Sequence, residues 1–146
     1  MSDAPGPLTL PRAIAEALLA HARAELPNEA CGLLGGRLAD GAGHAAAYFP
    51  ARNIEASPLR YNVHPEDLVR IVFALDDAGD DLVAIFHSHT RTPAVPSATD
   101  RRAAQYDRPF YLLASLAVPD APPESALRAW RIVGEHAFEV PLRVEG

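Results

Sequence analysis

The sequence has 146 residues, of which 49% are apolar, and a formal net charge of −6. This length fits a single domain over 1–146 with a substantial core. The acidic balance argues against nonspecific nucleic-acid binding, which depends on a basic surface. No apolar run approaches the roughly 20 residues needed to cross a membrane. The lone cysteine, Cys31, cannot form an internal disulfide, and residues 1–7 lack the features of a signal peptide, so we expect a cytoplasmic protein.

The first half of the chain alternates helical and strand-like patterns separated by proline and glycine. In chain order, with approximate bounds, we expect a loose lead-in (1–7), a helix (11–25), a strand (29–37), a turn (40–43), a strand (44–49), an irregular stretch (53–59), a short strand (60–63) and a helix (65–79). Pro11 is placed as the first residue of its helix, where proline is favoured. Pro65, Glu66 and Asp67 make a favourable first turn, because carboxylates suit the positive end of the helix dipole.

The second half of the chain predicts a central strand and a C-terminal hairpin. We expect a strand (82–87), a helix that begins at Ser97, a strand (110–116), a loop (119–125), and a hairpin of two strands (126–133 and 137–144). The unbroken apolar character of 82–86 indicates burial on both faces, hence a central position. Together these elements predict an α/β (α+β) fold with one mixed β-sheet flanked by helices. The strand order does not follow from the sequence.

Three candidate metal ligands lie between Ile85 and Asp100. Because a strand repeats every two residues, His87 and His89 project from the same face. Ser97 suits a helix N-cap and Asp100 its first turn, so the carboxylate is expected to face back toward the strand end. Three protein ligands with a fourth position open are typical of a catalytic zinc site.

Each half of this pattern has an ordinary structural explanation. Two histidines at a strand end are often polar residues that meet a loop, and S-x-x-D is a common helix start. Together with Glu29 on a glycine-rich strand, they form E…H-x-H-x(7)-S-x(2)-D. This pattern resembles the JAMM/MPN zinc metalloprotease family, in particular its compact, stand-alone bacterial-type members. The resemblance covers nearly the whole chain, since 27–35 resembles the family's glutamate strand and 60–67 its middle segment.

The resemblance implies a JAMM/MPN (cytidine-deaminase-like) architecture and a role for each motif residue. It implies that His87, His89 and Asp100 bind Zn²⁺ and that Glu29 is the general acid/base. It also implies that Ser97 donates a hydrogen bond to the reacting oxygen, in addition to capping its helix.

Three neighbouring residues carry separate expectations. The family usually has proline after the second histidine, where this sequence has Thr90, and we expect Pro93 and Pro96 to stiffen the loop instead. Cys31 shares a strand face with Glu29; a thiol near the metal is one interpretation, and a small buried core residue is the favoured one. Ser88 points away from its histidine neighbours; it could hydrogen-bond elsewhere in the site, and packing or a loop contact is the alternative.

The resemblance implies a zinc-dependent isopeptidase or peptidase. Its substrate would be the amide bond after the C-terminal Gly-Gly of a ubiquitin-like or sulfur-carrier protein, and sulfur transfer and protein deconjugation stay open as pathways. An alternative is a non-catalytic scaffold of the same fold, although such relatives typically lose ligands that are present here. A zinc deaminase expects H-x-E and a later P-C-x-x-C, which a chain with one cysteine cannot supply. The oligomeric state is undetermined, with a homodimer as one alternative.

Overall fold

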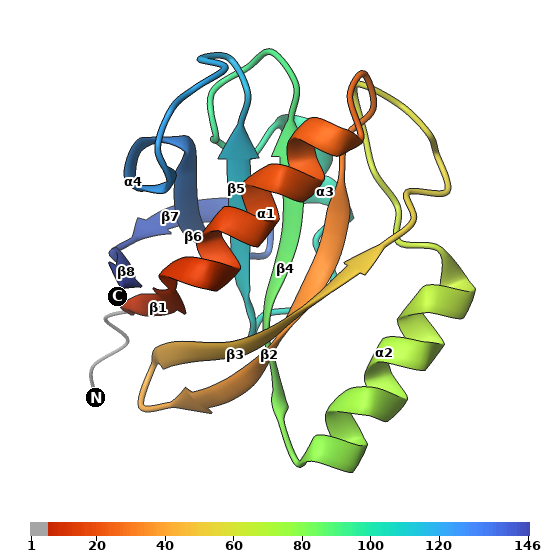
Figure 1. Ribbon diagram of the computed structural model, residues 1–146. Coiled ribbons are helices and arrows are strands. Elements are labelled where there is room, and N and C mark those ends of the chain that lie inside the picture. The colour runs from red at the N-terminus through yellow and green to blue at the C-terminus, as the bar shows by residue number, and fades with distance from the viewer. Residues whose placement is uncertain (1–5) are drawn as a thin grey trace.

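The computed structural model describes residues 6–146, which form one mixed sheet of eight strands and four helices (Figure 1). The strands are β1 (Leu8–Pro11), β2 (Cys31–Ala39), β3 (Ala42–Ala51), β4 (Asp81–His89), β5 (Phe110–Ser115), β6 (Leu127–Val133), β7 (His136–Val140) and β8 (Leu142–Glu145). The helices are α1 (Arg12–Ala24), α2 (Pro65–Ala78), α3 (Ala98–Ala103) and α4 (Pro123–Ala126). The predicted fold class is confirmed. None of the helices within 6–146 is long and apolar enough to span a membrane.

The sheet places β4 at its centre, in the order β7-β6-β5-β4-β2-β3-β1-β8. β4 pairs in parallel with β5 and antiparallel with β2, and its residues 83–89 are all buried. The central position predicted from the apolar run is therefore confirmed. His87 and His89 consequently lie at the end of a strand that is held on both sides.

Helices pack on opposite faces of the sheet and define two apolar clusters. One cluster contains Leu18 and Ala22 of α1, which crosses in front of β4 in Figure 1. The other contains Ile71 and Leu75 of α2 together with Ile85 of β4. Because strand side chains alternate, Ile85 and the histidines two and four positions further along share the α2 face. The candidate site thus lies on the face opposite α1.

The N-terminal strand β1 was not predicted. Leu8, Thr9 and Leu10 are buried; all three pair with β8, and Leu8 and Thr9 also pair with β3. Four residues are too few to establish a period of two, which explains why the sequence pattern missed this strand. Pro11 ends β1 and caps α1, so its placement as the first helical residue was wrong by one position.

The expected loose lead-in lies mostly outside the described residues. Its last two residues are described and are hydrogen-bonded. The Gly6 amide donates to the Gly41 carbonyl at 2.8 Å, and the Pro7 carbonyl accepts from the Gly43 amide at 3.0 Å. Residues 6 and 7 are therefore attached to the turn between β2 and β3 and to the start of β3.

The predicted C-terminal strand over 137–144 is two strands. Pro141 separates β7, which pairs with β6, from β8, which pairs with β1. Proline has no amide to donate to a ladder, so it ends the first pairing. Because one residue joins the two outermost strands, the sheet curls until its edges lie near each other (Figure 1).

Two shorter predictions were also wrong. Residues 60–63 do not form the expected strand; Val63 makes only an isolated β-bridge with Asn53. The expected loop over 119–125 contains the start of the one-turn helix α4.

An ion pair attaches α2 to the end of β3. Asp67 in the first turn of α2 is 7% exposed, and its Oδ2 accepts from the Arg52 amide at 2.8 Å and from Arg52 Nε at 3.0 Å. Its Oδ1 accepts from Arg52 Nη2 at 3.0 Å. These hydrogen bonds hold the pKa of Asp67 well below its usual range. The N-cap of α2 is His64, whose Nδ1 accepts from the Glu66 amide.

We predict that Asp67→Asn destabilises the fold in a pH-dependent way. Because the pKa of Asp67 is lower in the folded than in the unfolded chain, the unfolded chain takes up the proton first as pH falls. The contribution of the Asp67 carboxylate to the free energy of unfolding is therefore complete above the unfolded pKa of about 3.9 and is lost as pH falls below it. At pH 7 the free energy of unfolding should fall by about 1 kcal/mol, and the difference from the wild type should shrink below about pH 4. Denaturant titration measures both values. The exposed Asp77→Asn on the same helix is the control, and a loss independent of pH would contradict the assignment.

Candidate metal centre

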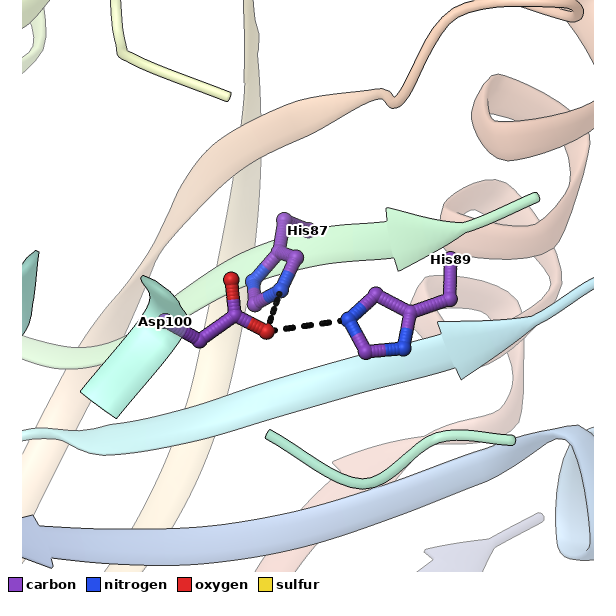
Figure 2. Close-up of side chains that lie close together, drawn as sticks. All are labelled: His87, His89 and Asp100. Carbon is purple, nitrogen blue, oxygen red and sulfur yellow. Dashed lines mark hydrogen bonds and ion pairs between the residues drawn. The ribbon is translucent and has the colours of Figure 1, made fainter. Parts of the chain in front are cut away.

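His87, His89 and Asp100 converge at the end of β4. Asp100 Oδ2 lies 3.1 Å from His87 Nε2 and 3.0 Å from His89 Nε2 (Figure 2). The side chains are 2%, 6% and 8% exposed, and one potential ligand atom from each lies within 4.8 Å of the others. The structure therefore brings together all three residues predicted as ligands.

A capping box holds Asp100 toward the histidines. Ser97 Oγ accepts from the Asp100 amide at 3.0 Å, and Asp100 Oδ2 accepts from the Ser97 amide at 2.9 Å. This reciprocal pair is the standard way in which a Ser and an acidic residue three positions later begin a helix. The predicted N-cap is confirmed, and the carboxylate faces the strand end as expected.

A backbone carbonyl orients the His89 ring. His89 Nδ1 lies 2.8 Å from the Pro93 carbonyl oxygen, which can only accept. Nδ1 therefore carries a proton, and Nε2 is the ring nitrogen that faces Asp100 and is placed to bind a metal. A carbonyl bonded to the distal nitrogen is the usual support for a histidine that binds a metal.

The loop that carries this carbonyl is anchored on both sides of Pro93. Ser115 Oγ donates to the Thr92 carbonyl at 2.7 Å, and Trp130 Nε1 donates to the Ala94 carbonyl at 2.9 Å. Both donors come from neighbouring strands of the sheet. Their roles were not predicted, because neither residue has a ligand-like spacing.

Thr90 occupies the position where the family usually has proline. Its Oγ1 donates to the Pro58 carbonyl at 3.3 Å. The hydroxyl thus connects the end of β4 to the loop between β3 and α2. Pro96 is buried, whereas Pro93 is exposed and contributes its carbonyl.

The His87 ring is held by stacking. Tyr61 lies against it with the ring centroids 4.3 Å apart and an interplanar angle of 17°. Burial lowers the pKa of His87 despite its contact with Asp100, which favours the neutral ring that a metal requires. Its Nδ1 is buried without a hydrogen-bond partner among the described residues. The sequence placed Tyr61 in a segment that resembles the family but gave it no role.

The contacts between Asp100 and the histidines shift the pKa values of His89 and Asp100 in opposite directions. Burial alone would lower the pKa of His89, but hydrogen bonds to Asp100 and to the Pro93 carbonyl outweigh it and raise that pKa. Burial would likewise raise the pKa of Asp100, yet the hydrogen bonds with both histidines hold it well below its usual range. Asp100 is therefore a charged carboxylate that faces two imidazole nitrogens.

Glu29 lies beside this group. The residue is 4% exposed, and its Oε1 is buried without a hydrogen-bond partner among the described residues. Burial raises the pKa of Glu29 to about 7, with opposing smaller effects from His89, which lowers it, and Asp100, which raises it. A buried carboxyl group that titrates near neutral pH suits proton transfer.

A loop side chain fixes the backbone at Glu29. The Glu29 amide donates to the Ser57 carbonyl at 2.8 Å, and its carbonyl accepts from Asn53 Nδ2 at 3.1 Å. Asn53 Nδ2 also donates to the Arg60 carbonyl, and its Oδ1 accepts from the amides of Glu55 and Asn62. Asn53 therefore organises the loop around Glu29. The sequence missed it, because this loop read as irregular.

The remaining candidates have plain structural positions. Cys31 is fully buried in the apolar cluster on the α2 face, and burial raises the pKa of its thiol to about 12, so the core interpretation is confirmed. Ser97 is an exposed residue whose Oγ accepts in the capping box. Its hydroxyl proton is not used in that bond and is available for donation.

A groove of about 420 Å³ lies next to His87 on the same face of the sheet. Tyr61, which stacks on His87, and Ile85, two positions before it, both line the groove. Leu68 of α2 and Thr99 and Arg102 of α3 line it as well. The groove therefore runs between the two helices and reaches the residues that surround the candidate metal ligands.

The donor set fits a divalent metal ion. Two imidazole nitrogens and one carboxylate oxygen converge within 4.8 Å, and these are ligands that zinc and other first-row metals accept. Asp100 Oδ2 lies 3.1 Å from His87 Nε2 and 3.0 Å from His89 Nε2, so these three residues would hold the ion together.

The chain matches a family model described as prokaryotic homologs of the JAB domain over residues 11–133. It belongs to this family, which confirms the resemblance inferred from the motif.

Relatives and solved structures agree with this assignment. The chain is 36% identical to the CysO-cysteine peptidase of Mycobacterium tuberculosis (strain ATCC 25618 / H37Rv), over 90% of this chain and 86% of the relative. It is 35% identical to the desampylase of Haloferax volcanii, over 89% of this chain and 91% of the relative. A protein from Desulfitobacterium hafniense, solved in solution, superposes with a TM-score of 0.86 at 35% identity, covering 95% of this chain and 93% of the other.

We predict that Asp100→Ala weakens metal binding directly. The change removes one of three ligands and the contact shared by both histidines, so zinc affinity should fall about a hundredfold or more. Competition with a chromophoric chelator measures the affinity. Asp120→Ala, which changes an exposed carboxylate, is the control, and an unchanged affinity in Asp100→Ala would exclude this residue as a ligand.

Proposed function

We propose that this protein is a zinc-dependent isopeptidase or peptidase that hydrolyses the amide bond after the C-terminal Gly-Gly of a ubiquitin-like or sulfur-carrier protein. The observation that carries the proposal is a buried His-His-Asp group beside a separate carboxyl group whose pKa is about 7. The names of two relatives, CysO-cysteine peptidase and desampylase, support peptide or conjugate cleavage.

His87, His89 and Asp100 would hold the ion, and Glu29 would move the protons. When bound, zinc supplies a nucleophilic water at neutral pH, because it lowers the pKa of that water from about 15.7 to about 7. Hydrolysis needs one proton removed from water and one delivered to the leaving amine. Glu29 is suited to both steps, since it has no hydrogen-bond partner at Oε1 and a pKa near the working pH.

Ser97 would stabilise the charge that develops on the reacting carbonyl. Its amide and hydroxyl already position Asp100, which places the hydroxyl at the edge of the site. Loss of one donor to a developing oxyanion typically costs on the order of a hundred- to a thousandfold in rate.

The groove beside His87 suits an extended tail. Its walls come from α2, α3 and the segment around Tyr61, and it leads toward the ligands. Glycine has no side chain, so a Gly-Gly segment can approach such walls closely and hydrogen-bond through its backbone. This geometry favours a substrate whose last residues before the cleaved bond are glycines.

We predict metal-dependent cleavage of a small sulfur-carrier or ubiquitin-like protein that carries a C-terminal extension after Gly-Gly. Mass spectrometry should show release of the extension by the zinc-loaded protein, loss of release with a chelator, and recovery on addition of zinc. The matched substrate replaces Gly-Gly by Ala-Ala and should be cleaved far more slowly. No release by the zinc-loaded protein from several such carriers would reject the proposed function.

We also predict that Glu29→Gln separates catalysis from metal binding. The amide cannot exchange protons, so kcat should fall roughly a hundred- to ten-thousandfold while zinc stoichiometry stays unchanged. Glu135→Gln, in the exposed turn between β6 and β7, controls for the loss of a carboxylate. If Glu29→Gln kept near-normal kcat, the acid/base role would have to go to another residue.

A further inference from the structure

Ser88 lies between the two histidines and contacts the segment that carries Glu29. It is fully buried, and strand alternation directs its side chain away from the face of His87 and His89. The Ser88 amide donates to the Ala30 carbonyl at 3.0 Å, and the Ala30 amide donates to Ser88 Oγ at 2.8 Å. One residue of the ligand strand thus holds both backbone groups of the residue that follows Glu29.

This double contact replaces a regular rung of the sheet. The ladder between β2 and β4 ends with the pair Cys31 and His87, so Ala30 and Ser88 would be the next pair. In an antiparallel hydrogen-bonded pair, each residue donates to the backbone carbonyl of the other. Here the hydroxyl of Ser88 takes the place of its carbonyl. The chain therefore leaves the regular ladder at Ala30, immediately after Glu29.

The position of the Glu29 carboxyl depends on such backbone contacts. Its Oε1 has no hydrogen-bond partner among the described residues, so the carboxyl is held through its main chain. Ser57 and Asn53 hold the Glu29 backbone from the loop between β3 and α2, whereas Ser88 belongs to the ligand strand itself. Ser88 is thus a direct connection between the proton carrier and the metal ligands.

We propose that Ser88 is a positioning residue that sets the distance between the Glu29 carboxyl and the metal held by His87 and His89. The proposal rests on the proposed function, because it assigns Glu29 a role in proton transfer. Displacement of a reacting group by about 1 Å can cost on the order of a hundredfold in rate. Removal of the Ser88 hydroxyl also leaves the buried Ala30 amide without its acceptor, which favours such a displacement.

The central test compares Ser88→Ala with Ser88→Thr, which keeps the hydroxyl. For Ser88→Ala we expect kcat to fall about ten- to a hundredfold with less than about a threefold change in KM, and for Ser88→Thr we expect recovery of most of the loss. Ser88→Cys has a side chain of similar volume that is only a weak acceptor, so its kcat should lie between those of Ser88→Ala and Ser88→Thr. It also provides a second variant if Ser88→Ala does not fold. The exposed Ser125→Ala is the control for loss of a serine hydroxyl.

A double-mutant cycle with Glu29→Gln identifies the residue through which Ser88 acts. If Ser88 acts through Glu29, adding Ser88→Ala to Glu29→Gln should cause little further loss of kcat. An additive loss would overturn the proposal. So would a fall in zinc affinity as large as that expected for Asp100→Ala, because Ser88 would then act on the ligands.

Two measurements without substrate keep this test separate from that of the proposed function. Zinc stoichiometry should be unchanged in Ser88→Ala, and amide hydrogen exchange at Ala30 should accelerate at least about tenfold relative to neighbouring β2 amides. If the wild type cleaves no Gly-Gly substrate, the proposed function fails, whatever Ala30 shows. If the wild type is active and Ser88→Ala has wild-type kcat, the positioning role alone is rejected.

Discussion

One carboxylate oxygen, Asp100 Oδ2, joins the two elements from which the site is built. It faces Nε2 of both histidines of β4 and accepts from the Ser97 amide at the start of α3. A charged carboxylate in so buried a position is stable only when its oxygens are hydrogen-bonded or paired with positive charge. The first turn of α3 therefore cannot move without breaking contacts to the central strand. The side chain of Asp100, which completes the capping box, thus also faces both histidines.

Two carboxyl groups in one site have opposite electrostatic environments. Hydrogen bonds to both histidines keep the pKa of Asp100 low, whereas burial raises the pKa of Glu29 to about 7. Such a difference separates a group that holds fixed charge from one that exchanges protons, a pattern known from enzymes that use paired carboxyl groups. Here the difference arises from position: Asp100 lies among donors, and Glu29 Oε1 has none within the described chain.

The ligands are supported mainly through backbone groups of two loops. Asn53 holds the carbonyl of Glu29, and Trp130 holds the carbonyl of Ala94 next to the Pro93 carbonyl that orients His89. Both loops surround the end of β4, and the Thr90 hydroxyl connects its end to the first of them. Hydrogen bonds to the distal ring nitrogen, and to the loop that provides its partner, maintain a metal-binding histidine in one orientation. A central strand with paired neighbours gives the site a rigid base.

The sequence by itself determined the features that depend on local spacing. The period of two placed His87 and His89 on one face, and the capping pattern oriented Asp100 toward them, because strand alternation and helix capping act within a few residues. The family pattern pointed to Glu29, but only the register that pairs Cys31 with His87 brings it beside the ligands. The stacking of Tyr61 and the hydrogen bond from Trp130, 36 residues from Ala94, were likewise decided by the tertiary structure. Contacts between distant segments depend on the strand order and on the curvature of the sheet. Both depend in turn on β1 and on the break at Pro141, and no local pattern encodes that order.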